Sequence, residues 1–419
     1  MSFCGLDFGT SNSTIGVVNN DAIAMIPLES DETLMRTAIF IDEEEKAFLY
    51  GREGVNAYLD GDEGRLMLSI KSVLGTPLMH EKTNVLNEMV PFTSIIGLFI
   101  SEVKARAEQV RGHEITDVVM GRPVRFNDDN DVLDKQAENA LRDVAEKQGF
   151  KNIEFQLEPI AAAKAFRSNH HIEGNLLIVD IGGGTSDFTI LTSDVSNPSE
   201  DFKVLGTSGI HIGGTNLDQA LALSKVMPEL GMNSLMRTMN GSDITIPTAW
   251  FHQLSTWHEI NRLYPAATIK SIQQALISAL DKKRTNRLIH VLTNQQGHRI
   301  LEDVEHCKRH LSSLDKAAIS LEVIEADLNI EVGKEEFEQA IDASITLIRN
   351  KINELVMQCG LRKDKINYVF YTGGTTLIPM VQNTINHMLP NAKALTGDML
   401  HSVGIGLTLD AKEKFVEKS

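Results

Sequence analysis

The sequence contains little cysteine and only short apolar runs. Its three cysteines, Cys4, Cys307 and Cys359, are too few and too scattered for a disulfide framework or a thiolate metal site. The longest apolar stretch, around residues 95–100, is far shorter than the roughly 20 residues that cross a bilayer. The first residues show neither the basic region nor the apolar core of a signal peptide. We therefore expect a cytoplasmic protein in a reducing compartment, with no membrane partner.

The sequence also has fewer basic than acidic residues. The chain has 40 lysines and arginines against 57 acidic residues, so its net charge is −17. Such a charge disfavours non-specific binding to DNA, RNA or anionic membranes, and we expect no nucleic-acid partner. The apolar fraction of 42% and the charged fraction of 23% are ordinary for a soluble globular protein. A length of 419 residues favours two lobes or domains over one compact core.

What the sequence does contain is an acidic, glycine-rich hairpin. The apolar run Leu176–Val179 is typical of a strand buried on both faces, and it leads through Asp180 into Gly182–Gly184. Glycines let the backbone approach a ligand closely, and the N–H groups of such a turn can cradle phosphate oxygens. Asp180 can face the same ligand through a hard metal ion. Thr185 adds a hydroxyl group, and Asp187 begins the return strand.

The same arrangement occurs once earlier, over residues 3–18, where Asp7 precedes the turn. A single glycine turn is weak evidence of phosphate binding, because most such turns only reverse the chain. Two copies with an aspartate at the same point of each turn are much stronger. Two facing hairpins can clasp one polyphosphate, with the carboxylates of Asp7 and Asp180 on either side of one Mg²⁺ ion.

Elsewhere the pattern alternates between strands and helices. Residues 117–123 and 153–157 are predicted to be strands. Residues 133–149 predict a helix with one apolar face and a glycine stop, and residues 337–355 predict a longer amphipathic helix. Alternation of this kind indicates an α/β fold.

Three other features are open to interpretation. The pair Gly213–Gly214 opens a predicted helix, so this turn is either an anion site or a plain cap. Lys71 lies among apolar and small residues and, judged alone, is a surface lysine. Residues 227–298 show no catalytic or binding pattern; Trp250 and Trp257, seven residues apart, predict a helix face in a local core.

Together these motifs, in this order, resemble the nucleotide-binding domain of the DnaK-type heat-shock chaperones, within the actin-like ATPase superfamily. The similarity covers nearly the whole chain apart from residues 227–298, and is greatest to the short YegD-like chaperone-like proteins, which have the ATPase part only. It implies an α/β, ribonuclease H-like fold with two duplicated lobes around a nucleotide cleft. The implied lobes are residues 1–170 plus 396–419 and residues 171–395, with no peptide-binding domain.

The resemblance also implies which residues bind ATP or ADP and Mg²⁺. Lys71 matches the lysine that orients the attacking water, and Glu158 matches the glutamate of a connecting helix that reaches the metal shell. The implied metal residues are Asp7, Glu158 and Asp180. The implied catalytic residues are Lys71, Thr10, Glu158, Asp180 and Asp187. The implied nucleotide-binding residues are Gly9, Thr10, Ser11, Asn12, Gly182, Gly183, Gly184, Thr185, Gly213, Gly214, Glu305, Lys308, Arg309, Ser312, Gly373, Gly374 and Thr375.

The sequence departs from the family pattern at three places. Leu377 stands where these chaperones carry an arginine stacked against adenine, so base preference is affected. Asp131 stands where the arginine partner of the switch proline, Pro123, is expected, which affects the relay to a second domain. No apolar linker follows Gly404–Gly406, and residues 412–419 predict a polar helical tail.

The function implied is ATP binding with slow, Mg²⁺-dependent hydrolysis that drives lobe closure, together with an unknown protein partner or client. Two alternatives stay open. One is a small-metabolite kinase of the same superfamily, which needs a carboxylate base in a sugar pocket that the sequence does not identify. The other is a nucleotide-gated interaction protein or filament former.

Overall fold

The computed structural model of the chain describes residues 2–127, 130–167, 172–193, 202–238, 240–395 and 397–416. Its first large sheet has the strand order β11-β10-β1-β2-β3, with the short strand β4 paired to β2. The strands of this sheet are β1 Phe3–Phe8, β2 Asn12–Asn19, β3 Ala22–Met25, β4 Met35–Arg36, β10 Asp117–Arg122 and β11 Asn152–Leu157. The β1–β2 and β2–β3 pairs are antiparallel, whereas the β1–β10 and β10–β11 pairs are parallel.

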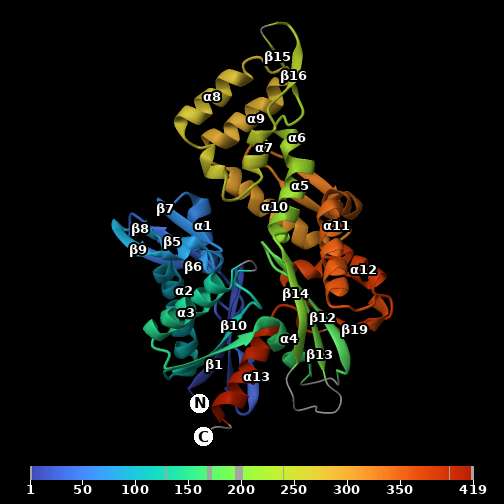
Figure 1. Cartoon of the computed structure of the whole chain (residues 1–419). Helices are drawn as coiled ribbons and strands as arrows, with labels where there is room; N and C mark the ends of the chain where they lie inside the picture. The colour runs from blue at the N-terminus through green and yellow to red at the C-terminus, as the bar shows by residue number, and fades with distance from the viewer. Residues whose placement is uncertain are drawn as a thin grey trace.

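A second large sheet repeats this arrangement in the order β14-β13-β12-β19-β20. Its strands are β12 Gly174–Ile181, β13 Ser186–Ser193, β14 Lys203–Ile210, β19 Ile366–Thr372 and β20 Lys393–Leu395. Again a central hairpin is extended by one antiparallel strand on one side and by two parallel strands on the other. The two hairpins predicted from the sequence, β1–β2 and β12–β13, therefore occupy equivalent positions in two sheets of the same topology (Figure 1).

Two helices, α4 Glu158–Arg167 and α13 Ser402–Val416, pack tightly against each other and lie between the sheets (Figure 1). Small residues on both helices allow this approach. A Cβ on Gly406 of α13 would lie only 1.8 Å from the carbonyl oxygen of Ala161, within the alanine run of α4. The Nζ of Lys164 donates to Oδ1 of Asp410 at 2.5 Å, which fixes one helix against the other in a buried setting. The apolar residues around this pair come from both sheets.

Smaller sheets and further helices surround these layers. The remaining strands are β5 Ala38–Asp42, β6 Ala47–Tyr50, β7 Gly64–Leu68, β8 Lys82–Val85, β9 Glu88–Pro91, β15 Leu235–Arg237, β16 Asp243–Thr245, β17 Lys316–Ser320 and β18 Asn329–Gly333. The remaining helices are α1 Gly51–Asp60, α2 Phe92–Arg111, α3 Asp131–Lys147, α5 Gly214–Leu221, α6 Met227–Glu229, α7 Ala249–Leu254, α8 Ala266–Leu276, α9 Lys282–Thr293, α10 Gly297–Leu311, α11 Lys334–Gln358 and α12 Pro379–Met388. Among the described residues, no helix combines the length and the apolar character needed to cross a bilayer.

The structure corrects one prediction about the tryptophans. Trp250 and Trp257 do not share a helix face, because α7 ends at Leu254. The hydroxyls of Ser255 and Thr256 both donate to the carbonyl of His252, at 3.0 and 2.8 Å, a local pattern that competes with continuing the helix. Trp257 lies in the turn that follows. The predicted polar tail is the end of α13, and residues 417–419 lie outside the described residues.

Candidate functional site

The turns of the two acidic hairpins meet. The backbone N–H of Gly183 donates a hydrogen bond to Oγ of Ser11 at 3.2 Å, although the two residues are 172 positions apart. A Cβ on Gly183 would lie 2.4 Å from that oxygen, so the contact requires glycine. The structure thus joins the two turns that follow Asp7 and Asp180. The other predicted residues of these turns are Gly9, Thr10 and Asn12 in the first, and Gly182, Gly184 and Thr185 in the second.

Lys71 is buried next to these turns. Its Nζ donates to Oε1 of Glu158 at 2.6 Å, at the start of α4. Burial by itself lowers the pKa of Lys71, but the carboxylates of Glu158 and Asp7 outweigh that effect and raise it. The lysine therefore stays protonated and acts as a hydrogen-bond donor rather than a base. The interpretation of Lys71 as a surface lysine is wrong, because long-range packing covers it.

The carboxylates around Lys71 carry perturbed pKa values. Burial raises the pKa of Asp7 to about 7, repulsion from Glu158 adds to the shift, and Lys71 offsets part of it. Burial also raises the pKa of Asp180 well above its usual range, with Asp187 the next contributor. Asp180 and Asp187 are directly opposite in the β12–β13 pair, where like charges repel. Lys71 is one cation among four carboxyl groups, those of Asp7, Glu158, Asp180 and Asp187, and a bound cation would add positive charge.

A small cavity of about 30 Å³ adjoins these carboxylates, and its lining includes Glu158, Asp180 and Asp187. A water molecule needs roughly 10–15 Å³ of such space, so the cavity has room for water next to the acidic groups. Among the residues that the structure describes, no three histidine, cysteine, aspartate or glutamate side chains are close enough to hold a metal ion together. The carboxylate oxygens of Asp7, Glu158 and Asp180 are of the kind that Mg²⁺ prefers as ligands.

The glycines at the start of α5 pack against the second hairpin turn. The N–H of Gly214 donates to the carbonyl of Gly182 at 3.0 Å. Gly213 lies so close to the turn that a Cβ there would be 2.6 Å from the carbonyl carbon and oxygen of Gly183. The plain-cap interpretation of Gly213–Gly214 is therefore incomplete, because these residues also position the second turn.

The turn after β19 also contacts the second hairpin turn, next to the start of α5. The hydroxyl of Thr375 donates to the carbonyl of Gly182 at 2.8 Å. Gly373 has a φ of +83°, and a Cβ at this position would lie 2.7 Å from Oδ1 of Asp180. Gly374 follows as an exposed residue. Three predicted turns, far apart in the sequence, thus surround one backbone loop.

Helix α10 supplies the predicted residues on the outer side of the site. The Nζ of Lys308 donates to the carbonyl of Gly214 at 3.2 Å and to Oδ2 of Asp218 at 2.7 Å. Burial raises the pKa of Asp218 to about 6, and Lys308 opposes that shift. Sequence reasoning missed Asp218, although its place four residues after Gly214 on one helix was a usable signal. Arg309 and Ser312 lie near the end of α10, where the Ser312 hydroxyl donates to the Arg309 carbonyl at 2.6 Å.

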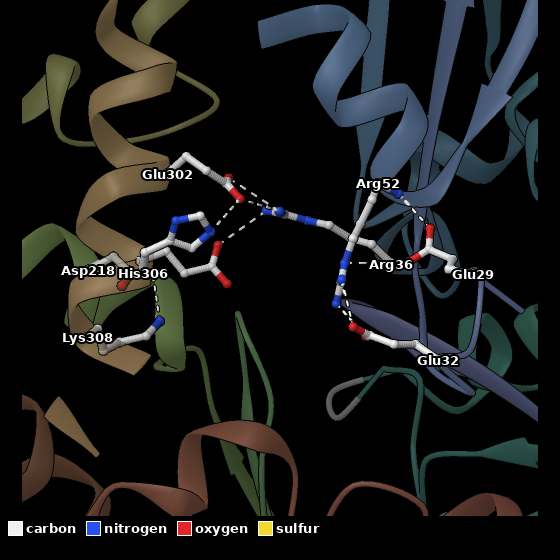
Figure 2. Close-up of polar contacts among 9 residues, drawn as sticks. Glu29, Glu32, Arg36, Arg52, Asp218, Glu302, His306 and Lys308 are labelled. Carbon is white, nitrogen blue, oxygen red and sulfur yellow. Dashed lines mark hydrogen bonds and ion pairs between the residues drawn. The ribbon is translucent and has the colours of Figure 1, made fainter. Parts of the chain in front are cut away.

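Glu305, also on α10, forms an ion pair with Arg36 of the first large sheet, and Arg36 also reaches Glu302 (Figure 2). Arg36, at the end of β4, donates to both carboxylate oxygens of Glu302 at 3.3 Å and to Oε2 of Glu305 at 3.4 Å. Burial would raise the pKa of Glu305, but the cations around it, Arg36 first, hold it below its usual range. The guanidinium also lies 5.9 Å from the Trp257 ring centre. No local pattern in the sequence indicates these ion pairs, because Glu302 and Glu305 lie 266 and 269 residues after Arg36.

The positions that depart from the family pattern have structural roles. Leu377 is an exposed residue at the end of the short helix Gly374–Leu377. Asp131 begins α3 and forms an ion pair with Arg125. The arginine of this pair therefore lies at position 125, two residues after Pro123, and not at position 131. Pro123 itself lines the small cavity next to Glu158.

Comparison with protein-family models gives a match that accords with this geometry. The model described as Hsp70 protein matches residues 3–230 and 272–411. The unmatched residues 231–271 include β15, β16 and α7, within the region that showed no functional pattern in the sequence. The predicted actin-like ATPase fold is confirmed by this match together with the two mixed sheets of equal topology. The chain belongs to the Hsp70 family, and it is an ATP-binding, chaperone-like protein of that family.

Proposed function

We propose that this protein binds ATP with Mg²⁺ between the two acidic hairpins, hydrolyses it slowly and uses the bound nucleotide to close two lobes. The observation that supports the proposal most directly is the hydrogen bond from the Gly183 N–H to the Ser11 hydroxyl, which brings both hairpin turns to one place. The lobes would be residues 1–170 plus 396–419 and residues 171–395. Hinge closure of this kind around a ligand is a common switch.

The carboxylates would hold a hydrated cation, chiefly Asp7 and Asp180, with Glu158 in its outer shell. The raised pKa values of Asp7 and Asp180 support this role, as does the water-sized cavity lined by Glu158 and Asp180. When bound, Mg²⁺ would neutralise part of the negative charge of the phosphate oxygens and of these carboxylates. The exposed N–H groups of the two glycine turns would bind the phosphate oxygens, as such turns do elsewhere.

Lys71 would position the attacking water. Its raised pKa keeps the ammonium group charged, and its hydrogen bond to Glu158 fixes the direction of that group. A fixed cation next to the transferring phosphoryl group stabilises the charge that develops there. Thr10 and Asp187 would support the water and the phosphate.

The test compares ATP turnover by Lys71→Met and Asp180→Asn with that of the parent. We expect turnover to fall about tenfold to a hundredfold in each variant, because each removes one fixed group at the reacting centre. ATP binding, measured by calorimetry with Mg²⁺, should weaken far less in Lys71→Met than turnover does. Parent-like turnover in both variants would remove the mechanism. ATP consumption that rises only when a sugar is added would favour the kinase alternative.

Lys104→Met is the matched control for Lys71→Met. Lys104 is also 8% exposed and also forms a 2.6 Å ion pair, with Glu108, but it lies on α2 away from the hairpin turns. Both substitutions break a buried ion pair and should lower stability by a similar amount, of the order of 3 kcal/mol. Only Lys71→Met should reduce the turnover of the protein that remains folded.

A further inference from the structure

Helices α11 and α12 lie side by side on the outer side of the second large sheet (Figure 1). A polar groove is lined by residues of both helices, away from the acidic hairpins. Its volume is about 740 Å³, within the range of roughly 300–1,000 Å³ that ligand sites occupy. Its polar lining includes Arg349, Asn350 and Asn353 on α11, Lys363 in the turn after that helix, and Asn383 and His387 on α12.

The charges along the groove are separated. Arg349 and Lys363 are exposed and have no ion-pair partner within the described part of the chain, whereas their neighbours Lys351 and Arg362 are paired with acids. Glu338 lines the groove eleven residues before Arg349 on α11, which is about 16 Å along the helix. One end of the groove is therefore cationic and the other end acidic, in a protein whose net charge is −17.

Amide groups also line the groove. Asn350, Asn353 and Asn383 each carry a donor and an acceptor. Asn350 and Asn383 are exposed, so a ligand in the groove can reach their amides. The Oδ1 atom of Asn353 is buried and does not face a ligand in the groove.

Two methionines give the groove an apolar wall. Met380 and Met388 are half-buried lining residues on α12, eight positions apart, which corresponds to about 12 Å. An extended peptide advances about 13 Å in four residues, so side chains on one face of it can contact both methionines. Thioether side chains adapt to varied apolar partners.

We propose that this groove binds an extended acidic peptide segment of a partner protein. Carboxylates of the peptide pair with Arg349 and Lys363, and a backbone N–H donates to Oδ1 of Asn350. Apolar side chains of the peptide contact Met380 and Met388. A peptide fits better than a compact anion because the charged end, the amides and the apolar wall are spread along the groove. The site is separate from the nucleotide cleft and does not depend on ATP hydrolysis.

The test uses a fluorescein-labelled hexapeptide that alternates glutamate and leucine, titrated with the full chain in 0.15 M salt. We expect the acidic peptide to bind at least about tenfold more tightly than the same peptide with glutamine in place of glutamate. The double variant R349E/K363E should weaken binding by about tenfold or more. Asn350→Ala keeps the net charge and should weaken binding about threefold, since it removes only one exposed amide.

The control is K351E/K365E, which reverses one lysine on α11 and one in the same turn as Lys363 but leaves the groove lining intact. The two double variants have equal net charge. Equal loss of binding in both would show non-specific attraction and overturn the proposal. Equal affinity for the acidic and glutamine peptides, or full competition by millimolar inorganic phosphate, would also overturn it. R349E/K363E should keep the parent's thermal unfolding midpoint, because the Arg349 and Lys363 side chains are exposed.

Discussion

At the scale of single residues, the buried carboxyl groups of Asp7 and Asp180 are unfavourable for folding when ionised but suited to binding a cation. Both carboxyl groups have raised pKa values, mainly because they are buried, and each lies near other acids. A carboxylate in such a setting favours the proton-bound form until a cation arrives. Groups with values of this kind cluster at functional sites, which is why these two residues are the best candidates for cation binding.

The Asp7→Asn variant should be more stable than the parent at high pH without nucleotide. Between about pH 4 and 7 the folded Asp7 keeps a proton that the unfolded chain releases, so the parent loses stability as pH rises through this window. The asparagine variant does not titrate, and we expect its free energy of unfolding to be about 1–3 kcal/mol higher at pH 8. Thermal unfolding at pH 4, 6 and 8 measures the difference.

The advantage of Asp7→Asn should disappear near pH 4, where the parent carboxyl is protonated. Addition of Mg²⁺ and ADP should reverse the order at pH 8, because only the parent can use the cation. A pH-independent difference would contradict the assignment of the effect to Asp7.

At the scale of elements, the second hairpin turn is held by backbone contacts from α5 and from the turn after β19. These contacts leave one position of the turn open. A Cβ on Gly213 would clash with Gly183, whereas a Cβ on Gly184 would meet nothing within 4 Å. The turn is therefore packed on the side of Gly213 and free on the side of Gly184, where a phosphate is expected.

Gly184→Ala and Gly213→Ala should separate these two sides. Gly213→Ala forces backbone atoms apart and should lower the free energy of unfolding by about 1–3 kcal/mol. Gly184→Ala should leave thermal unfolding unchanged but weaken ATP binding about tenfold or more, because the methyl group fills the space of the phosphate. Calorimetry and thermal unfolding on both variants check this. Unchanged ATP affinity in Gly184→Ala would argue against a phosphate site at this turn.

At the scale of the whole molecule, Arg36 links the first large sheet to Glu302 and Glu305 on α10 (Figure 2). Tyr58 and His298 add to this link, since their rings lie 5.1 Å apart edge to face. Burial lowers the pKa of His298 to about 4, so it stays neutral at physiological pH. These contacts join β4 and α1 to α10.

Arg36→Ala should speed nucleotide release. The side chains of the Arg36–Glu302 pair are 24% and 18% exposed, so we expect a contribution of about 0.5–1 kcal/mol, or a two- to fivefold faster off-rate. The difference should shrink in high salt. Stopped-flow release of a fluorescent ADP analogue measures it.

Arg52→Ala is the matched control for Arg36→Ala. Arg52 pairs with Glu29 and Glu32 on its own side of the cleft (Figure 2). The Arg52→Ala variant should release the fluorescent ADP analogue at the parent's rate. Equal acceleration by both variants would contradict a role for the bridge.

The sequence by itself determined the two hairpins, the α/β pattern and the family. Apolar runs such as Leu176–Val179 and glycine turns encode strands and reversals locally, so the pattern was sufficient. It also placed Asp7 and Asp180 at equivalent points of two turns. The lobe boundaries and the roles of individual site residues stay predictions.

Only the tertiary structure decided which of these residues meet. The burial of Lys71 against Glu158, the Arg36 bridge, the Lys308–Asp218 pair and the groove between α11 and α12 all join residues from separate elements. Such contacts depend on how helices and sheets pack. No local pattern encodes them, because the side chains involved are ordinary surface types until packing covers or pairs them.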